Sequence, residues 1–294
     1  MLLDSSESIA SLKYIRAIES KMLIIDTFIF YNELDLLLYR LSILDEYVDM
    51  FILVESTHTF TGHTKPLWYK DNKEMFHKFN HKIVHVVVED FPYKYPHINY
   101  DHGEQWKNEH HQRNAIQWGV NALQLFDNDI ILTSDVDEIP NPNVLKDAKN
   151  GTLLYDVNTL NRLALDMYYY NLTYRIGEGS NWHGVKLFTM AAYKTMGLTF
   201  QDMRLYEHSH PVPIIPNGGW HLSYFGDTRF IVNKVASFSH QEYNNDNYLK
   251  QETLEHKIKN GINLLNDSEL IHIPIESNTN LPPKYEIYLK KFMN

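Results

Sequence analysis

Short apolar runs and amphipathic segments alternate along the first half of the chain. Four apolar, β-branched stretches have the length and composition of buried strands, at 22–30, 50–54, 82–88 and 130–134. From Leu34 to Leu44 apolar residues recur every three or four positions, which predicts an amphipathic helix over 33–44. Further helices are predicted near 71–79 and over 104–125. Strands separated by helices favour a mostly parallel sheet, so the expected class is α/β.

The pattern changes after Pro142. Strands of a more antiparallel kind are expected within 152–170 and 183–193, and another strand at 221–225 after a Pro/Gly-rich segment. Two helices are predicted to follow, near 228–238 and 246–265. At the other end of the chain, Ile9, Leu12, Ile15 and Ile18 have helical spacing, which favours a helix packed on the domain. We expect one compact unit over residues 1–294.

Charge and composition narrow the functional classes. The net charge of −10 argues against non-specific nucleic-acid binding, which requires a basic surface. With no cysteine, the chain has no disulfide, no zinc–thiolate site and no thiol nucleophile, which fits a reducing compartment. Its apolar runs are shorter than the roughly 18–20 residues of a membrane span. We therefore expect a soluble, cytoplasmic protein without a transmembrane segment.

The most informative motif is an acidic pair at the end of the fourth apolar run. Asp135 and Asp137 follow the predicted strand 130–134, and strand alternation places both on one side of the chain. Carboxylates beyond the carboxyl end of a buried strand lie where open α/β sheets bind ligands. Mg²⁺ and Mn²⁺ favour carboxylate oxygens and often bridge to substrate phosphates. The motif indicates either a metal site or a solvated acidic turn, and no glycine-rich phosphate loop accompanies it.

Four blocks of sequence together resemble glycosyltransferase family 17. They are FYNELDLLLYRL (30–41), VDMFILVESTHTFTGHTKPL (48–67), DVDEIP (135–140) and GGWHLSYF (218–225). The resemblance implies a GT-A-like fold, with a Rossmann-type sheet, helices on both faces and a smaller antiparallel acceptor-side region. It further implies inverting transfer of a sugar, N-acetylglucosamine above others, from a UDP-sugar to a glycan. Residues 22–141 would bind the nucleotide sugar, and 142–294 would form the acceptor-side half.

The family's animal members have a membrane anchor and lumenal cysteines, and neither is expected here. This difference leaves the compartment and the acceptor open. The linkage and the oligomeric state are open as well.

By this resemblance, Asp137 would bind Mn²⁺ or Mg²⁺ directly, and Asp135 would bind it through water or hold the ribose. His221 would be a third ligand, with His240 as a competitor and a buried, hydrogen-bonded histidine as the structural alternative. Glu138 would orient the pair or begin a helix.

Polar residues at the carboxyl ends of the predicted strands are candidates for binding the nucleotide sugar. Asn32, Glu33 and Glu55 follow the first two strands, although Asn32 also suits a helix N-cap. Arg113 could pair with phosphate, or with Glu109 one helical turn earlier.

A catalytic base should come from the second half, and the candidates are Glu242, Glu207, Asp202 and Glu178, with Glu242 favoured. Trp182 and Trp220 could stack on acceptor sugars, or be buried in the core.

Two other functions compete with sugar transfer. A non-catalytic carbohydrate-binding protein on the same scaffold would bind glycans without nucleotide. A metal-dependent phosphate-ester hydrolase would need a denser set of His and Asp ligands than the first half contains.

Overall fold

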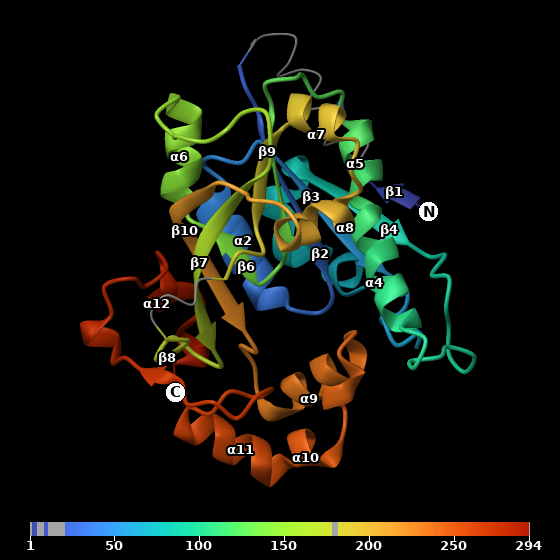
Figure 1. The fold of residues 1–294 in the computed structure, drawn as a ribbon, viewed down its shortest axis with the longest axis vertical. Helices are drawn as coiled ribbons and strands as arrows, with labels where there is room; N and C mark the ends of the chain where they lie inside the picture. The colour runs from blue at the N-terminus through green and yellow to red at the C-terminus, as the bar shows by residue number, and fades with distance from the viewer. Residues whose placement is uncertain (1, 5–8, 11–20, 178–181, 294) are drawn as a thin grey trace.

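The computed structural model describes residues 2–4, 9–10, 21–177 and 182–293. Within these residues, 11 strands form one sheet with helices on both faces (Figure 1), which confirms the predicted α/β class. The main path through the sheet runs β1-β4-β3-β2-β5-β9-β7-β10-β6. The N-terminal helix predicted from Ile9 to Ile18 falls almost wholly outside the described residues. Over the described residues, no helix combines the length and the apolar character required to cross a membrane.

The four strands predicted in the first half are confirmed and lie side by side. They are β2 (Ile24–Phe30), β3 (Met50–Ser56), β4 (Ile83–Val88) and β5 (Ile130–Asp135). All neighbours among them are parallel, in the order β4-β3-β2-β5. Because β3 and β5 flank β2 on opposite sides, the strand order reverses at β2. The carboxyl ends of these strands therefore meet at the kind of crevice where α/β sheets bind ligands.

Two apolar layers sandwich this parallel region. One layer holds α2 (Leu34–Leu44), α3 (Trp68–Asp71), the 3₁₀ segment η1 (Lys73–Lys82) and α6 (Pro142–Asn150). The opposite layer holds α5 (Ile116–Ala122), α7 (Met190–Met196) and α8 (Phe200–Leu205). On the same face, α4 (Glu104–Asn114) contacts β2 and β3, and its buried side chains are polar. The single helix predicted over 104–125 is thus two helices, which meet at Ala115. Close packing constrains α5, since a Cβ added at Gly119 would collide with Ile52 on β3.

The second half of the sheet mixes directions. β9 (Lys186–Thr189) runs antiparallel to β5 and to β7 (Asn161–Tyr169), whereas β7 and β10 (Ile214–Ser223) are parallel. The strands predicted at 152–170 and 183–193 are shorter in the structure, because the Thr189 side chain caps α7 and ends the second of them. β10 begins earlier than predicted. β6 (Glu138–Pro140), which was not predicted, pairs antiparallel with β10. Gly219 on β10 has a φ of +145° and lies close to the backbone of Ile139 on β6.

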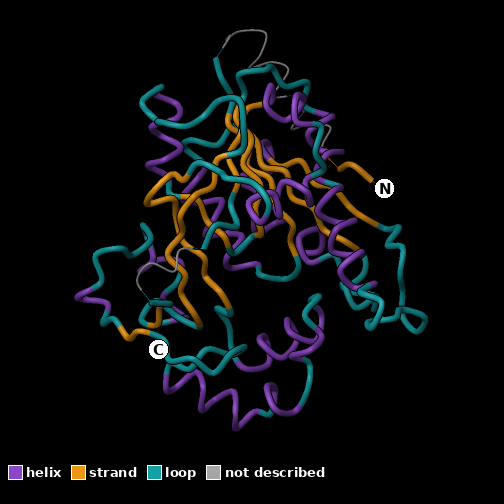
Figure 2. The backbone as a smooth tube through the Cα atoms, viewed as in Figure 1, coloured by secondary structure: helices purple, strands orange, loops and turns teal. Residues whose placement is uncertain are grey.

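Helices after β10 form a separate layer beyond the carboxyl end of the sheet. They are α9 (Thr228–Ser237), α10 (Asp246–Leu249) and α11 (Gln251–Asn260), so the helix predicted at 246–265 is two helices. Figure 2 shows this layer below the strands. Ile231, Val235 and Leu254 pack there against Tyr169 and Tyr224. The layer thereby closes one side of the crevice.

The remaining elements are short. They are β1 (Leu2–Asp4), β8 (Tyr174–Arg175), η2 (Tyr206–His208), η3 (Gln241–Tyr243), β11 (Ile271–His272), η4 (Ile275–Ser277), α12 (Tyr285–Tyr288) and η5 (Lys290–Phe292).

Candidate active site

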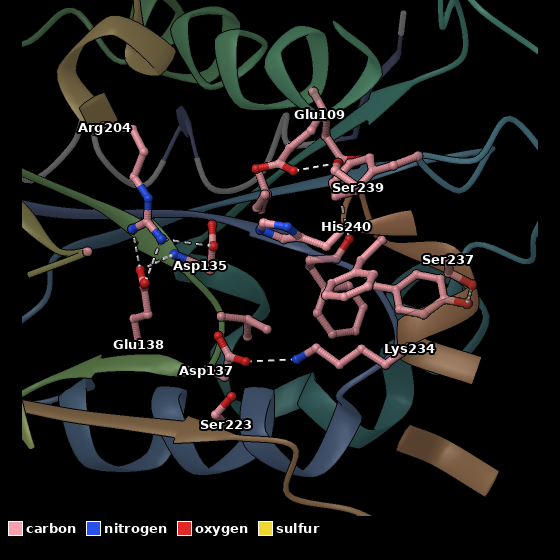
Figure 3. Close-up of a pocket in the computed structure, with 18 of the residues that line it drawn as sticks. Glu109, Asp135, Asp137, Glu138, Arg204, Ser223, Lys234, Ser237, Ser239 and His240 are labelled. Atoms are coloured by element: carbon pink, nitrogen blue, oxygen red, sulfur yellow. Dashed lines mark hydrogen bonds and ion pairs between the residues drawn. The ribbon is translucent and has the colours of Figure 1, made fainter. Parts of the chain in front are cut away.

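A cavity of about 610 Å³ opens at the carboxyl edge of the parallel strands. Residues after β2 and β3, the turn after β5, helices α4 and α8, and the segment from α9 to His240 all line it. Figure 3 shows that charged side chains from the two halves of the chain meet across this space. Such a volume is ample for a small-molecule ligand.

The acidic turn between β5 and β6 enters the cavity, and a buried arginine holds the turn from below. Arg40 on α2 donates to the backbone carbonyls of Asp135, Val136 and Glu138 at 3.0, 3.2 and 2.8 Å. Its guanidinium also forms a two-point ion pair with Asp26 on β2, at 2.8 and 2.6 Å. Both side chains of this ion pair are fully buried. The backbone of the acidic turn is therefore fixed before any ligand arrives.

Two arginines donate hydrogen bonds to the carboxylate of Asp135. Arg113 donates to Oδ1 at 2.5 Å, and Arg204 donates to Oδ2 at 3.2 Å. Arg113 is buried and also donates to Glu109 at 2.9 Å. Of the two partners that the sequence suggested for Arg113, phosphate or Glu109, the structure contains the ion pair with Glu109. Arg113 is not among the residues that line the cavity. Asp135 consequently connects Arg113 and Arg204 in a network of ion pairs.

Glu138 is buried behind the acidic pair and shares Arg204 with Asp135. Arg204 binds both of its carboxylate oxygens, at 2.6 and 2.7 Å, and the indole nitrogen of Trp182 donates to the same carboxylate. Burial acts to raise the pKa of Glu138, but Arg204 outweighs burial and brings the pKa down to about 2. Glu138 therefore stays ionised at neutral pH, and it begins β6 rather than a helix.

Asp137 lies opposite a different cation, as Figure 3 shows. Lys234 on α9 donates to its Oδ2 at 2.8 Å and lies 2.9 Å from the carboxylate of Glu33. His221 Nε2, on β10, is 3.7 Å from Oδ1. Burial acts to raise the pKa of Asp137, but Lys234 and His221 hold it well below its ordinary range. Asp137 thus presents a permanent negative charge, with a histidine on one side and an ammonium on the other.

A divalent cation at this position remains a prediction. Among the described residues, no three His, Asp or Glu side chains are gathered into a metal site. Asp137 and His221 nevertheless fit one, because carboxylate and imidazole both bind Mn²⁺ and His221 Nδ1 is buried without a hydrogen-bond partner. Asp135 does not fit as a direct ligand, since both of its oxygens accept from arginines. His240 is paired with Glu242, at 2.6 Å.

The predicted nucleotide-sugar residues separate into two groups. Glu33 lines the cavity, whereas Asn32 and Glu55 are not among its lining residues. Glu55 lies inside β3 rather than beyond it, because the strand is longer than predicted; it is fully buried beside His85, at 3.1 Å. Asn32 is not the N-cap of α2: that position belongs to Glu33, which makes no side-chain cap.

The two predicted acceptor tryptophans have different environments. Trp182 is 37% exposed and lies on the cavity wall, with its ring 4.9 Å from that of His221. Trp220 points into the core below the sheet and donates to the Asn280 carbonyl at 2.7 Å. The structural alternative therefore holds for Trp220, and Trp182 remains available to stack on a sugar.

The predicted bases separate in the same way. Glu207 lines the cavity and pairs with Lys186 at 3.2 Å and Arg162 at 3.5 Å. Glu242, which the sequence favoured, is 55% exposed, is bound to His240 and is not among the lining residues. Asp202 caps the start of α8 by bonding Thr199, and Glu178 lies outside the described residues.

Sequence reasoning missed three site residues, Arg40, Arg204 and Lys234. For Lys234 a signal existed, because it lies three residues after Ile231 and one before Val235, on the inward face of a predicted helix. For Arg204 the signal was weaker: Thr199 and Asp202 form a capping box that marks the unpredicted helix carrying it. Arg40 had been read only as part of an amphipathic helix.

Fold and cavity define a class: a Rossmann-type α/β protein with an acidic crevice at the carboxyl edge of its sheet. The profile of glycosyltransferase family 17 matches residues 4–268, and the chain belongs to that family, as its motifs predicted. It is 31% identical over 134 residues to the human and rat proteins named beta-1,4-mannosyl-glycoprotein 4-beta-N-acetylglucosaminyltransferase. The match covers 42% of this chain and only 22% of the length of these curated relatives.

Among solved structures, the chain is similar to the inositol-1-phosphate CTP transferase from T. maritima. The TM-score is 0.36 and the identity 13%, over 68% of this chain and 87% of that chain.

Proposed function

We propose that this protein is an inverting glycosyltransferase with a GT-A-like architecture. It transfers a sugar, N-acetylglucosamine above others, from a UDP-sugar to a glycan hydroxyl, with Mn²⁺ or Mg²⁺ as cofactor. The observation that carries the proposal is the position of Asp137. This ionised carboxylate faces the cavity at the end of β5, held between His221 and Lys234. Family membership and the names of the relatives support the same reaction class.

The reaction exchanges one bond at the anomeric carbon. The bond from C1 to the β-phosphate oxygen breaks, and its electron pair stays on that oxygen. The acceptor hydroxyl oxygen forms the new bond to C1 from the opposite side, and its proton passes to a carboxylate base. The divalent ion supplies Lewis-acid stabilisation of the departing diphosphate when it is bound.

The chain's own residues have distinct tasks in this scheme. Asp137 and His221 would hold the cation, and Arg40 keeps the backbone of the acidic turn in place beneath them. Among the candidate bases that the structure describes, Glu207 is the best placed, because it lines the cavity. Trp182, on the same wall, would contact the acceptor sugar with its ring.

The proposal is tested by incubating the protein with a panel of UDP-sugars and Mn²⁺, Mg²⁺ or EDTA, and measuring UDP release. We expect release with one preferred sugar, abolished by EDTA. In Asp137→Asn, turnover should fall at least about 100-fold, since metal stabilisation contributes several kcal/mol. Asp127→Asn, at an exposed surface ion pair with Lys194, is the matched control and should retain full turnover.

No UDP release with any sugar and metal would contradict the proposal. Calorimetric binding of glycans without nucleotide would then identify a carbohydrate-binding protein on this scaffold. A folded Asp137→Asn variant with normal turnover would remove Asp137 from the mechanism, so its melting temperature is measured alongside.

A further inference from the structure

The cavity is lined by more acidic than basic side chains, which is unfavourable for a ligand that carries a diphosphate. Six carboxylates are among the residues that line it, and three lining side chains are lysine or arginine. These cations are Lys65, Arg204 and Lys234. A diphosphate brought into this space is repelled by the acidic walls unless a cation contacts it directly. The question is which of the three side chains can do so.

Arg204 is already committed to other partners. Its two terminal nitrogens make three hydrogen bonds to Glu138 and Asp135, and its guanidinium lies 5.8 Å from the centre of the Trp182 ring. Moving this side chain would leave Glu138 buried and unpaired, which is costly. Arg204 is therefore a fixed part of the wall.

Lys65 has partners on the β3 side of the cavity. Its ammonium is 3.9 Å from the buried carboxylate of Glu55 and 5.5 Å from the centre of the Tyr31 ring. It also donates to the Pro66 carbonyl at 3.3 Å. These contacts place Lys65 beside β3 and the loop after β2, and none of them is with the acidic turn.

Lys234 is the cation beside Asp137, and its backbone is firmly anchored. Ile231 and Val235 bury the inward face of α9, and the Asp227 side chain caps the start of this helix at 2.7 Å. The preceding residue, Asn233, accepts from the Tyr31 hydroxyl at 2.7 Å, which ties α9 to the loop after β2. The helix therefore delivers the lysine stem to the acidic turn at a fixed position.

The ammonium itself keeps freedom that the stem lacks. Lysine has three N–H donors on a flexible four-carbon chain, and Asp137 and Glu33 accept from two of them. The third can reach a phosphate oxygen without loss of the contact with Asp137. A group bound beside Asp137 thus meets a cation that the protein supplies from its own chain.

We infer that Lys234 is a further catalytic residue, whose ammonium contacts the diphosphate of the donor and stabilises the negative charge that develops as the sugar leaves. Lysine retains its proton throughout, and the electron pair of the broken C1–O bond remains on the phosphate oxygen. A positive charge aimed at the place where negative charge develops is an effective form of transition-state stabilisation. The inference rests on the proposed function, and it adds a protein cation to the one held by Asp137 and His221.

The test compares three probes on the intact chain by calorimetry: UDP, uridine and inorganic pyrophosphate, each with and without Mn²⁺. Lys234→Met removes the charge, and Lys234→Gln removes it while retaining a hydrogen-bond donor for Asp137. We expect both variants to bind UDP and pyrophosphate about 10- to 100-fold more weakly, the range for one charge-assisted hydrogen bond. Uridine affinity should stay within about twofold, because uridine carries no phosphate.

Arg229→Gln is the matched control, since it removes an exposed cation from the same helix. Its affinities should equal those of the unchanged protein, and melting temperatures establish that all variants are folded. If the methionine variant unfolds because Asp137 loses its partner, the glutamine variant and Lys234→Arg, which keeps the charge and should keep UDP binding, decide the question.

The outcomes separate this inference from the proposed function. UDP affinity unchanged in both neutral variants overturns the role of Lys234 and leaves the proposed function standing. An equal loss for uridine and UDP also overturns it, because the lysine would then only shape the site. If the unchanged protein binds pyrophosphate through Lys234 but no UDP, the proposed donor fails and the diphosphate contact stands. Binding of neither probe contradicts both.

Discussion

The two sides of the cavity are built in different ways. On one side, β3 and β5 end in Ser56 and Asp135, and Glu33 follows β2 at the same edge of the parallel sheet. Arg40 locks the acidic turn onto this edge. On the other side, Arg204, His221 and Lys234 come from α8, β10 and α9, which follow one another along the chain but lie far in sequence from the strands that carry the acidic residues. The negative charges are thus placed by regular strand–helix units, and their positive partners are placed by tertiary packing. We expect the first side to be preformed and the second to tune what binds.

The largest test of this contrast removes the arginine beneath the acidic turn. Arg40→Met leaves the fully buried Asp26 without its partner, so the free energy of unfolding should fall by about 3–5 kcal/mol. The same substitution at a partly exposed pair outside the cavity, Arg175→Met opposite Asp166, should cost about 1 kcal/mol or less. Urea denaturation measures both. Equal losses would show that Arg40 does not hold the acidic turn more firmly than an ordinary surface ion pair would.

The next test concerns the base on the second side. Glu207→Gln should lower kcat about 100-fold, the lower end of the range for loss of a general base, with the UDP-sugar that the release assay selects. Glu242→Gln changes an exposed carboxylate outside the cavity lining and should leave kcat within about twofold. The reverse result would transfer the role to the segment after α9, and would favour the base that the sequence had suggested.

The smallest effect is expected where the two sides meet. A Cβ added at Gly184 would collide with the Glu138 carboxylate and the Arg204 guanidinium, so Gly184→Ala should destabilise the protein by about 1–2 kcal/mol. Gly177→Ala is the matched control, because its Cβ would meet only Ile271 at 3.8 Å. Thermal melts compare the two variants. If Gly184→Ala is as stable as the control, the ion pair has room to adjust.

Sequence reasoning succeeded where the information is local. The strands β2 to β5 and the acidic pair were predicted correctly because an apolar run, and the polar residues that end it, are visible in consecutive residues of the sequence. Glu55 was misplaced because β3 continues two residues further than its apolar run, and a buried partner, His85, makes that extension possible. Trp220 was ambiguous because burial depends on a distant carbonyl, that of Asn280.

The charge partners of the site could not be predicted in this way. Nothing in the local pattern pairs Arg204 with Glu138, or Arg40 with Asp26, because packing of separate elements brings them together. Lys234 is the partial exception, since a cation on the apolar face of a predicted helix indicates a buried partner. The identity of that partner still required the fold.

The turn from Tyr224 to Asp227, between β10 and α9, separates the two residues that reach Asp137 from opposite sides. His221 precedes this turn and Lys234 follows it. One residue inserted at the start of α9 would rotate every later helix position by about 100° and point the ammonium away from the carboxylate. The length of this connection is therefore part of the chemistry, even though none of its side chains needs to touch a substrate.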